Sequence, residues 1–166
     1  MTTRVDAAWA ALEDLADPEI PVISLRELGI LRDVRSGPDG LEVVITPTYN
    51  GCPAMDQIAD DERSALERSG IPARVVTQLA PAWTTDWITD AGKERLRVYG
   101  IAPPQRTAAS DSVLRFIARP AAAEAVPCPR CGSANTVETS HFGSTACKAL
   151  YRCEDCREPF DYFKPY

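Results

Sequence analysis

Cys128-Pro-Arg-Cys131 and Cys153-Glu-Asp-Cys156 are the two stretches around which the C-terminal part of this sequence must fold. Each is a CxxC knuckle, and residues 132–152 between them are long enough to form a hairpin of strands. Two knuckles at this separation bring four thiolates to one tetrahedral ion, and the metal offsets the charge of those thiolates. We therefore interpret Cys128, Cys131, Cys153 and Cys156 as the ligands of a structural metal ion.

The knuckle sequences leave two candidate metals, zinc and iron. Tetrahedral four-cysteine sites hold zinc or iron, and Cys-Pro-x-Cys-Gly also occurs at the single-iron sites of electron carriers. The second knuckle lacks a following glycine, which favours zinc. Residues 128–166 are too few to bury an adequate core, so metal binding, worth ~10–16 kcal/mol in zinc fingers, would supply their folding free energy.

The composition of the 166-residue chain excludes several classes of protein. Its net charge of −6 and its pI near 4.8 argue against general nucleic-acid binding, which requires a basic surface. No signal-peptide core and no run of about 20 apolar residues is present, so we expect no membrane segment and a cytoplasmic protein. All cysteines except Cys52 lie between Cys128 and Cys156, which in a reducing compartment indicates metal and thiol chemistry instead of disulfides.

Hydrophobic periodicity and turn residues predict a small α+β layer at the N-terminal end of the chain. The expected order is helix, strand, strand, helix, strand, helix. The predicted helices are 5–16, 54–69 and 89–99, with a helical turn over 24–29, and the predicted strands are 30–35, 41–46 and 73–79. We expect an α/β domain over residues 1–104, a linker over 105–127 that contains a strand-like run at 113–118, and a zinc ribbon over 128–166.

Cys52 is the one cysteine outside the C-terminal group, and it lies in the loop Pro47-Thr-Tyr-Asn-Gly-Cys-Pro53. Proline is favoured at the first position of a helix, so Pro53 predicts that Cys52 is the N-cap, near the positive end of the helix dipole. That position would lower the pKa of the thiol. A small buried cysteine is the alternative. A cysteine nucleophile needs a base, and the only histidine, His141, is distant in sequence, so we assign no catalytic residue and leave open whether the chain is an enzyme.

Four motifs of the N-terminal part resemble the SufT-type iron–sulfur-assembly domain. They are Asp17-Pro-Glu-Ile-Pro21, Leu28-Gly29-Ile30, Thr46-Pro-Thr-Tyr-x-Gly-Cys-Pro53 and Pro81-Ala-Trp-Thr-Thr-Asp-Trp87. Together with Arg97-x-Tyr-Gly-Ile-Ala-Pro-Pro104 and the C-terminal ribbon, they resemble the PaaD family, which accompanies the phenylacetyl-CoA epoxidase of phenylacetate degradation. The resemblance covers nearly the whole chain, and residues 105–126 are the least matched.

The resemblance implies a two-layer assembly domain in which Cys52 is the functional thiol, and we expect Asp17, Glu19 and Thr48 to lie near it. It also implies a non-catalytic role in maturing iron centres, with a transient iron–sulfur cluster or iron on the chain and zinc in the ribbon. The implied clients are the di-iron oxygenase and the iron–sulfur reductase subunits of the epoxidase. A structural or electron-coupling subunit of the epoxidase is the alternative function, and the oligomeric state stays open.

Cys147 and two tryptophans have more than one interpretation each. Cys147 is a fifth cysteine near a site that needs only four. It could replace one of the four ligands, or serve as a second functional thiol beside Lys148. The remaining alternative is a buried cysteine without a chemical role. Trp83 and Trp87 are either structural anchors or a patch for a partner, since aromatic residues are enriched at interfaces. His141 is expected to stay outside a metal site that four cysteines already fill.

Overall fold

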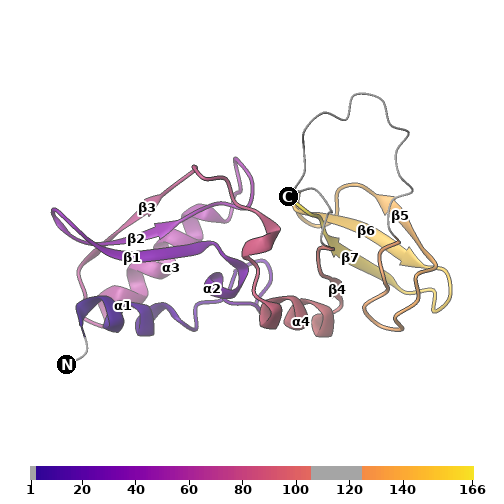
Figure 1. Cartoon of the computed structure of the whole chain (residues 1–166), viewed down its shortest axis with the longest axis horizontal. Coiled ribbons are helices and arrows are strands. Elements are labelled where there is room, and N and C mark those ends of the chain that lie inside the picture. The colour runs from indigo at the N-terminus through magenta and orange to yellow at the C-terminus, as the bar shows by residue number, and fades with distance from the viewer. Residues whose placement is uncertain (1–2, 106–124) are drawn as a thin grey trace. The chain divides into compact units, whose positions relative to one another are not determined.

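The computed structural model describes residues 3–105 and 125–166. These residues belong to two compact units that divide between Arg95 and Leu96 (Figure 1). In the described residues no helix is long and apolar enough to cross a membrane. The α+β architecture that the sequence predicts is confirmed.

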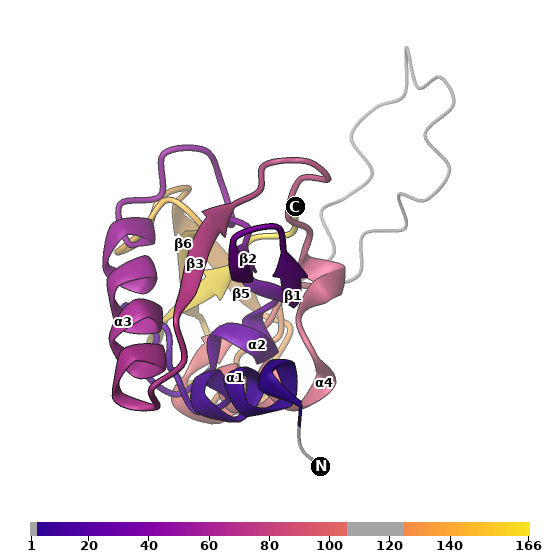
Figure 2. The same ribbon diagram turned by 90° about the vertical axis from the view of Figure 1, so that its left-hand side faces the viewer.

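The first unit is a three-stranded sheet with helices packed on it. Its strand order is β1-β2-β3, and α1 and α3 pack on each other and on the outer strands (Figure 2). The elements are α1 (Arg4–Leu12), α2 (Leu25–Leu28), β1 (Leu31–Gly37), β2 (Gly40–Ile45), α3 (Met55–Arg68), β3 (Ala73–Thr77), the 3-10 helix η1 (Thr85–Trp87) and α4 (Asp90–Tyr99), which crosses the division between the units.

Two features of α2 follow directly from its capping residues. Ser24 accepts a hydrogen bond from the backbone of Glu27, whose side chain accepts one from the backbone of Ser24, and Gly29 ends α2 in the left-handed region. This reciprocal arrangement is the predicted capping box. By contrast, the first helix ends at Leu12 and not at residue 16, because Ala16 pairs with Ser24 as an isolated bridge.

The parallel pairing of β2 with β3 places the loops that follow these two strands at the same end of the sheet. β1 and β2 form an antiparallel hairpin, whereas α3 carries the chain back so that β3 runs beside β2 in the same direction. The last paired residues are Ile45 and Thr77, so the loop after β2 and the loop after β3 leave the sheet at the same end. The loop after β2 contains Cys52.

Helix α3 buries one carboxylic acid, Glu62, among its apolar residues. Its buried positions are Ile58, Glu62, Ala65 and Leu66, which recur at the spacing of one helix face. Both carboxylate oxygens of Glu62 lack a hydrogen-bond partner among the described residues, and burial raises the pKa of this carboxyl to about 8. Hydrophobic periodicity predicts buried positions at Met55, Ile58, Ala59, Ala65 and Leu66, of which Met55 and Ala59 are only half-buried, and it does not predict the burial of Glu62.

The second unit is a four-stranded sheet that carries the ribbon. Its strands are β4 (Ile101–Ala102), β5 (Thr136–Ser140), β6 (Lys148–Cys153) and β7 (Pro159–Phe163), in the order β4-β7-β6-β5. β4 pairs in parallel with β7, and Ala102 packs in the same apolar cluster as Phe160 and Tyr162. The second unit begins at Leu96 and includes β4, whereas the boundary expected from the sequence is at residue 104. A two-residue strand has no periodicity that a sequence could reveal. The strand-like run at 113–118 lies outside the described residues.

Gly29 makes room for the tryptophan loop, and a substitution there is expected to be costly. Its φ is +79°, and a Cβ at this position would lie 2.7 Å from the Cβ of Trp87. We expect Gly29→Ala to lower the free energy of unfolding of the first unit by about 2–4 kcal/mol, from left-handed strain and overpacking. Gly70→Ala is the control, because Gly70 has a φ of +66° with open space around it. Equal losses in urea titrations of the two variants would contradict the role of Trp87.

Candidate metal centre and thiol sites

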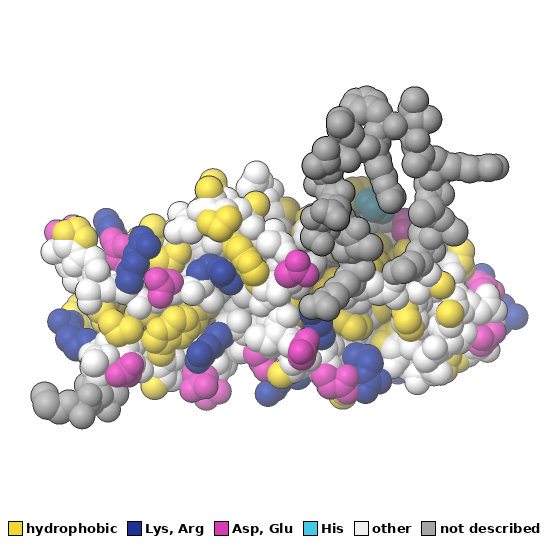
Figure 3. Space-filling view, in the orientation of Figure 1, with side chains coloured by type: hydrophobic (Ala, Val, Ile, Leu, Met, Phe, Trp, Pro, Cys, Tyr) yellow, Lys and Arg dark blue, Asp and Glu magenta, His cyan; other side chains and the backbone are white. Residues whose placement is uncertain are grey.

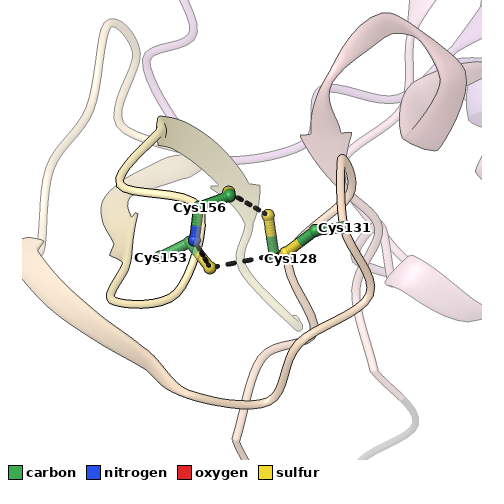
Figure 4. A group of neighbouring side chains, drawn as sticks. All are labelled: Cys128, Cys131, Cys153 and Cys156. Carbon is green, nitrogen blue, oxygen red and sulfur yellow. Dashed lines mark hydrogen bonds between the residues drawn. The ribbon is translucent and has the colours of Figure 1, made fainter.

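The four knuckle cysteines converge on one point of the second unit (Figure 4). Their sulfurs all lie within 4.8 Å of one another, with 3.7 Å between Cys128 and Cys156 and 3.6 Å between Cys131 and Cys153. Four thiolates at about 2.3 Å from one tetrahedral metal ion would be about 3.8 Å apart. The arrangement therefore fits a closed four-cysteine metal site.

Backbone geometry shapes each knuckle around its sulfurs. After the first knuckle, Gly132 has a φ of +76° and its N–H donates to the carbonyl of Cys128. After the second, Arg157 adopts a φ of +66°, the strained conformation that a glycine would tolerate better, and its side chain pairs with Glu154. Backbone N–H groups, first that of Cys156, lower the pKa of the Cys153 thiol to about 7, which favours the thiolate that a metal binds.

The metal site rests on a small apolar core and on side-chain bridges between the knuckles. Cys128 and Cys153 are buried in the cluster that contains Ala102, Val126, Phe160 and Tyr162, while Tyr151 stacks on Phe160. At the surface, the carboxylate of Asp155 in the second knuckle accepts hydrogen bonds from Ser133 and from Asn135, at 2.8 Å for the latter. These bonds, the Ser133 one first, lower the pKa of Asp155.

Cys147 and His141 lie apart from the metal ligands. Cys147 is buried, its thiol is 3.0 Å from the Thr145 hydroxyl, and it is not in the four-cysteine group. The buried ammonium of the adjacent Lys148 lies 3.5 Å from a carboxylate oxygen of Asp161. This placement favours the interpretation of Cys147 as a buried cysteine. His141 is exposed and pairs with Glu138.

Cys52 lies two residues before the cap of α3, so the prediction that it is the N-cap is wrong. The N-cap is Ala54, because residues 52–54 form a turn in which the N–H of Met55 donates to the carbonyl of Cys52. Burial raises the pKa of the thiol, and the charges of Glu19 and Asp17 raise it further. The N–H of Ala54 and the Tyr49 hydroxyl act in the opposite direction but are outweighed. The expected lowering of this pKa is therefore also wrong.

The two acidic residues that the sequence singled out act electrostatically on the Cys52 thiol. The Asp17 carboxylate accepts hydrogen bonds from the N–H groups of Glu19 and Ile20 at 2.9 and 2.8 Å, which holds this segment in a tight turn. Thr48 is buried in the same loop as Cys52. The sequence does not single out Tyr49, whose hydroxyl reaches the thiol, because only the turn Tyr49–Cys52 brings the two together.

Of the two tryptophans, Trp83 is an anchor within the first unit. It is buried, and its indole N–H donates to the carbonyl of Leu28 at 3.1 Å. Trp87 is half-buried, with the Arg32 guanidinium 3.5 Å above its ring. Because Trp83 is buried, it cannot belong to the partner-binding patch that was one of the two interpretations of the tryptophans. Arg32 covers part of Trp87.

An iron–sulfur-assembly domain followed by a zinc ribbon is the class of protein that this fold and its cysteines define. Residues 5–78 match the family model of the iron–sulfur cluster assembly protein, and residues 116–164 match that of the PaaD zinc beta ribbon domain. A domain of unknown function from Bacillus anthracis has a similar structure, with a TM-score of 0.51 and 25% identity over 56% of this chain and 91% of that one.

Two relatives narrow the assignment. A protein of Escherichia coli K12, named as a putative subunit of 1,2-phenylacetyl-CoA epoxidase, is 49% identical over 97% of this chain and 93% of its own length. An Fe-S protein maturation auxiliary factor of Bacillus subtilis is 35% identical over 48% of this chain and 76% of its own length. The chain belongs to the PaaD family.

Proposed function

We propose that this chain is a cytoplasmic, non-catalytic accessory protein that matures the iron centres of a phenylacetyl-CoA epoxidase. The likeness to a protein of that system over nearly the whole chain supports the choice of clients, its oxygenase and reductase subunits. The likeness of about half of the chain (48%) to Fe-S protein maturation auxiliary factors supports the activity. An iron ion or an iron–sulfur cluster is then the cargo that the chain passes on.

The observation that carries this proposal is the setting of Cys52. Its thiol is half-buried in a loop at one end of the sheet, where the charges of Glu19 and Asp17 and the Tyr49 hydroxyl act on it. A thiol that stays protonated until a metal arrives binds by releasing its proton, and competition from that proton lowers the apparent metal affinity, which favours release to a client. Such a group is better suited to hold cargo transiently than to attack a substrate.

Zinc is the metal that we assign to the four cysteines, where it stabilises the fold of the second unit. The donor set is four sulfurs within 4.8 Å of one another. Four thiolates fill a tetrahedral site and leave no ligand position for a substrate. The chemistry that a bound zinc supplies there is charge compensation for the thiolates. We assign no transfer step to it.

The test is Cys52→Ser with Cys147→Ser as the matched control. We expect Cys52→Ser to fold normally but to leave the epoxidase subunits short of iron by at least about tenfold, because serine is a poor soft-metal ligand. Iron content of purified oxygenase and reductase, produced with each variant, measures the effect. Normal client iron with Cys52→Ser would refute the proposal, and Cys147→Ser is expected to leave client iron unchanged.

A structural or electron-coupling role in the epoxidase is the second candidate. The 49% identical relative is named as a subunit of the epoxidase, and this observation favours the second role. Such a role requires stable, stoichiometric co-purification with active epoxidase and tolerates Cys52→Ser. Iron at the four cysteines would support electron coupling, whereas a colourless zinc protein would exclude it.

A further inference from the structure

The segment between β3 and η1 places four consecutive apolar residues in solvent. Leu79 is 61% exposed, and Ala80, Pro81 and Ala82 are exposed as well. Figure 3 shows apolar side chains gathered over this part of the first unit. A single exposed leucine is ordinary on a protein surface, but a continuous run that the fold holds outward is not.

Both ends of this run are fixed to the first unit. On one side, the N–H of Gln78 donates to the carbonyl of Ile45 at 2.8 Å. On the other side, the buried indole of Trp83 donates to the carbonyl of Leu28. The segment is therefore held in a defined shape, and a partner that binds it has less conformational entropy to remove.

The same end of the sheet carries the proposed transfer site. Because β2 and β3 are parallel, the Leu79–Ala82 segment and the loop of Cys52 both follow the carboxyl ends of paired strands, and Figures 1 and 2 show both loops leaving that end. The carboxylates of Asp17 and Glu19 act on the Cys52 thiol, and the whole chain has a net charge of −6. A partner that approaches this end meets an apolar segment beside negative charge.

We propose that residues 79–82 are the docking segment for the client protein, and that the client contributes an apolar pocket flanked by lysine or arginine. This inference rests on the proposed function, because it assigns to the Cys52 site the surface that brings a client to it. Leu79 enters the pocket, and the basic rim of the client faces the exposed carboxylate of Glu19, since Asp17 is buried. The apolar contact supplies affinity, while the charges steer the approach and set its orientation.

The test measures binding and iron transfer separately, with the full chain and purified iron-free epoxidase oxygenase as the probe. We expect Leu79→Asp to weaken binding at least about tenfold, equivalent to about 1.4 kcal/mol, while Leu79→Met binds like the wild type. Val98→Asp is the matched control, because Val98 is 72% exposed and lies in the second unit. Cys52→Ser is expected to bind normally and to transfer no iron.

The outcomes separate the docking segment from the proposed function. Binding of Leu79→Asp within twofold of wild type, or an equal loss with Val98→Asp, overturns the docking segment. Restoration of iron to the oxygenase by the wild-type chain, without measurable binding between the two proteins, also overturns the docking segment. Sedimentation of the free chain tests whether it self-associates. If the wild-type chain is a dimer and Leu79→Asp dissociates it, the segment is an interface between copies, and the inference is overturned. Full iron transfer by Cys52→Ser overturns the proposed function alone.

Discussion

Removal of the metal, by a chelator or by Cys153→Ser, is expected to unfold the second unit and to leave the first unit folded. Cys153 is fully buried among the four sulfurs, and the apolar cluster beneath the site is small. A structural zinc contributes on the order of 10 kcal/mol to such a module, which equals the whole stability of a typical domain. The two units should therefore lose structure separately.

The positions of the tryptophans make this prediction measurable. Trp9, Trp83 and Trp87 all lie in the first unit, so tryptophan fluorescence reports on that unit alone. NMR amide dispersion of residues 125–166 reports on the second unit, and a chromophoric chelator counts the metal released. Cys147→Ser is the control and should retain one zinc per chain. A folded second unit without metal, or full metal in Cys153→Ser, would contradict the assignment of the ligands.

Replacing Glu62 is expected to stabilise the first unit at neutral pH. Burial without a hydrogen-bond partner raises the pKa of Glu62 to about 8 from 4.5, so the folded state retains a proton that the unfolded chain releases. The stability from this group is fully present below pH 4.5 and is lost as the pH rises to about 8. Between pH 4.5 and pH 7 the loss is about 3 kcal/mol.

Glu62→Leu removes this titration and continues the apolar face of α3. We expect a gain of about 3 kcal/mol in the free energy of unfolding at pH 7 and a stability that no longer falls between pH 5 and pH 8. Glu62→Gln should flatten the pH dependence but gain less, since its amide stays unpaired. Urea titrations followed by tryptophan fluorescence measure both, with the exposed Glu67→Gln as control. A wild-type stability that rises between pH 5 and pH 7 would show that Glu62 is not the dominant group.

The metal site is the feature that was most predictable from sequence. Cys128 with Cys131, and Cys153 with Cys156, are pairs whose local spacing already places two sulfurs together. Only the antiparallel pairing of β6 with β7, and of β6 with β5, has to bring the pairs into contact. The capping box at Ser24 and Glu27 was predictable for the same reason, because its partners are three residues apart.

The environment of Cys52 was not predictable in the same way. Pro53 favours a helix start, but the turn over residues 52–54 moves the cap to Ala54 and takes Cys52 away from the helix end. Burial and the two carboxylates then reverse the expected direction of its pKa shift. Desolvation depends on which segments cover the thiol, and these come from distant parts of the chain.

The sequence by itself therefore determined the α+β class, the family, and the four cysteines of the candidate metal site, since these depend on local spacing and on motifs. The tertiary structure alone decided that Glu62 is buried, that β4 completes the second sheet, and that Cys52 shares one end of the first sheet with Leu79. The physical reason is that burial, pKa and proximity arise from contacts between segments far apart in the chain. A periodic pattern records which face of an element is apolar, but not what that face meets.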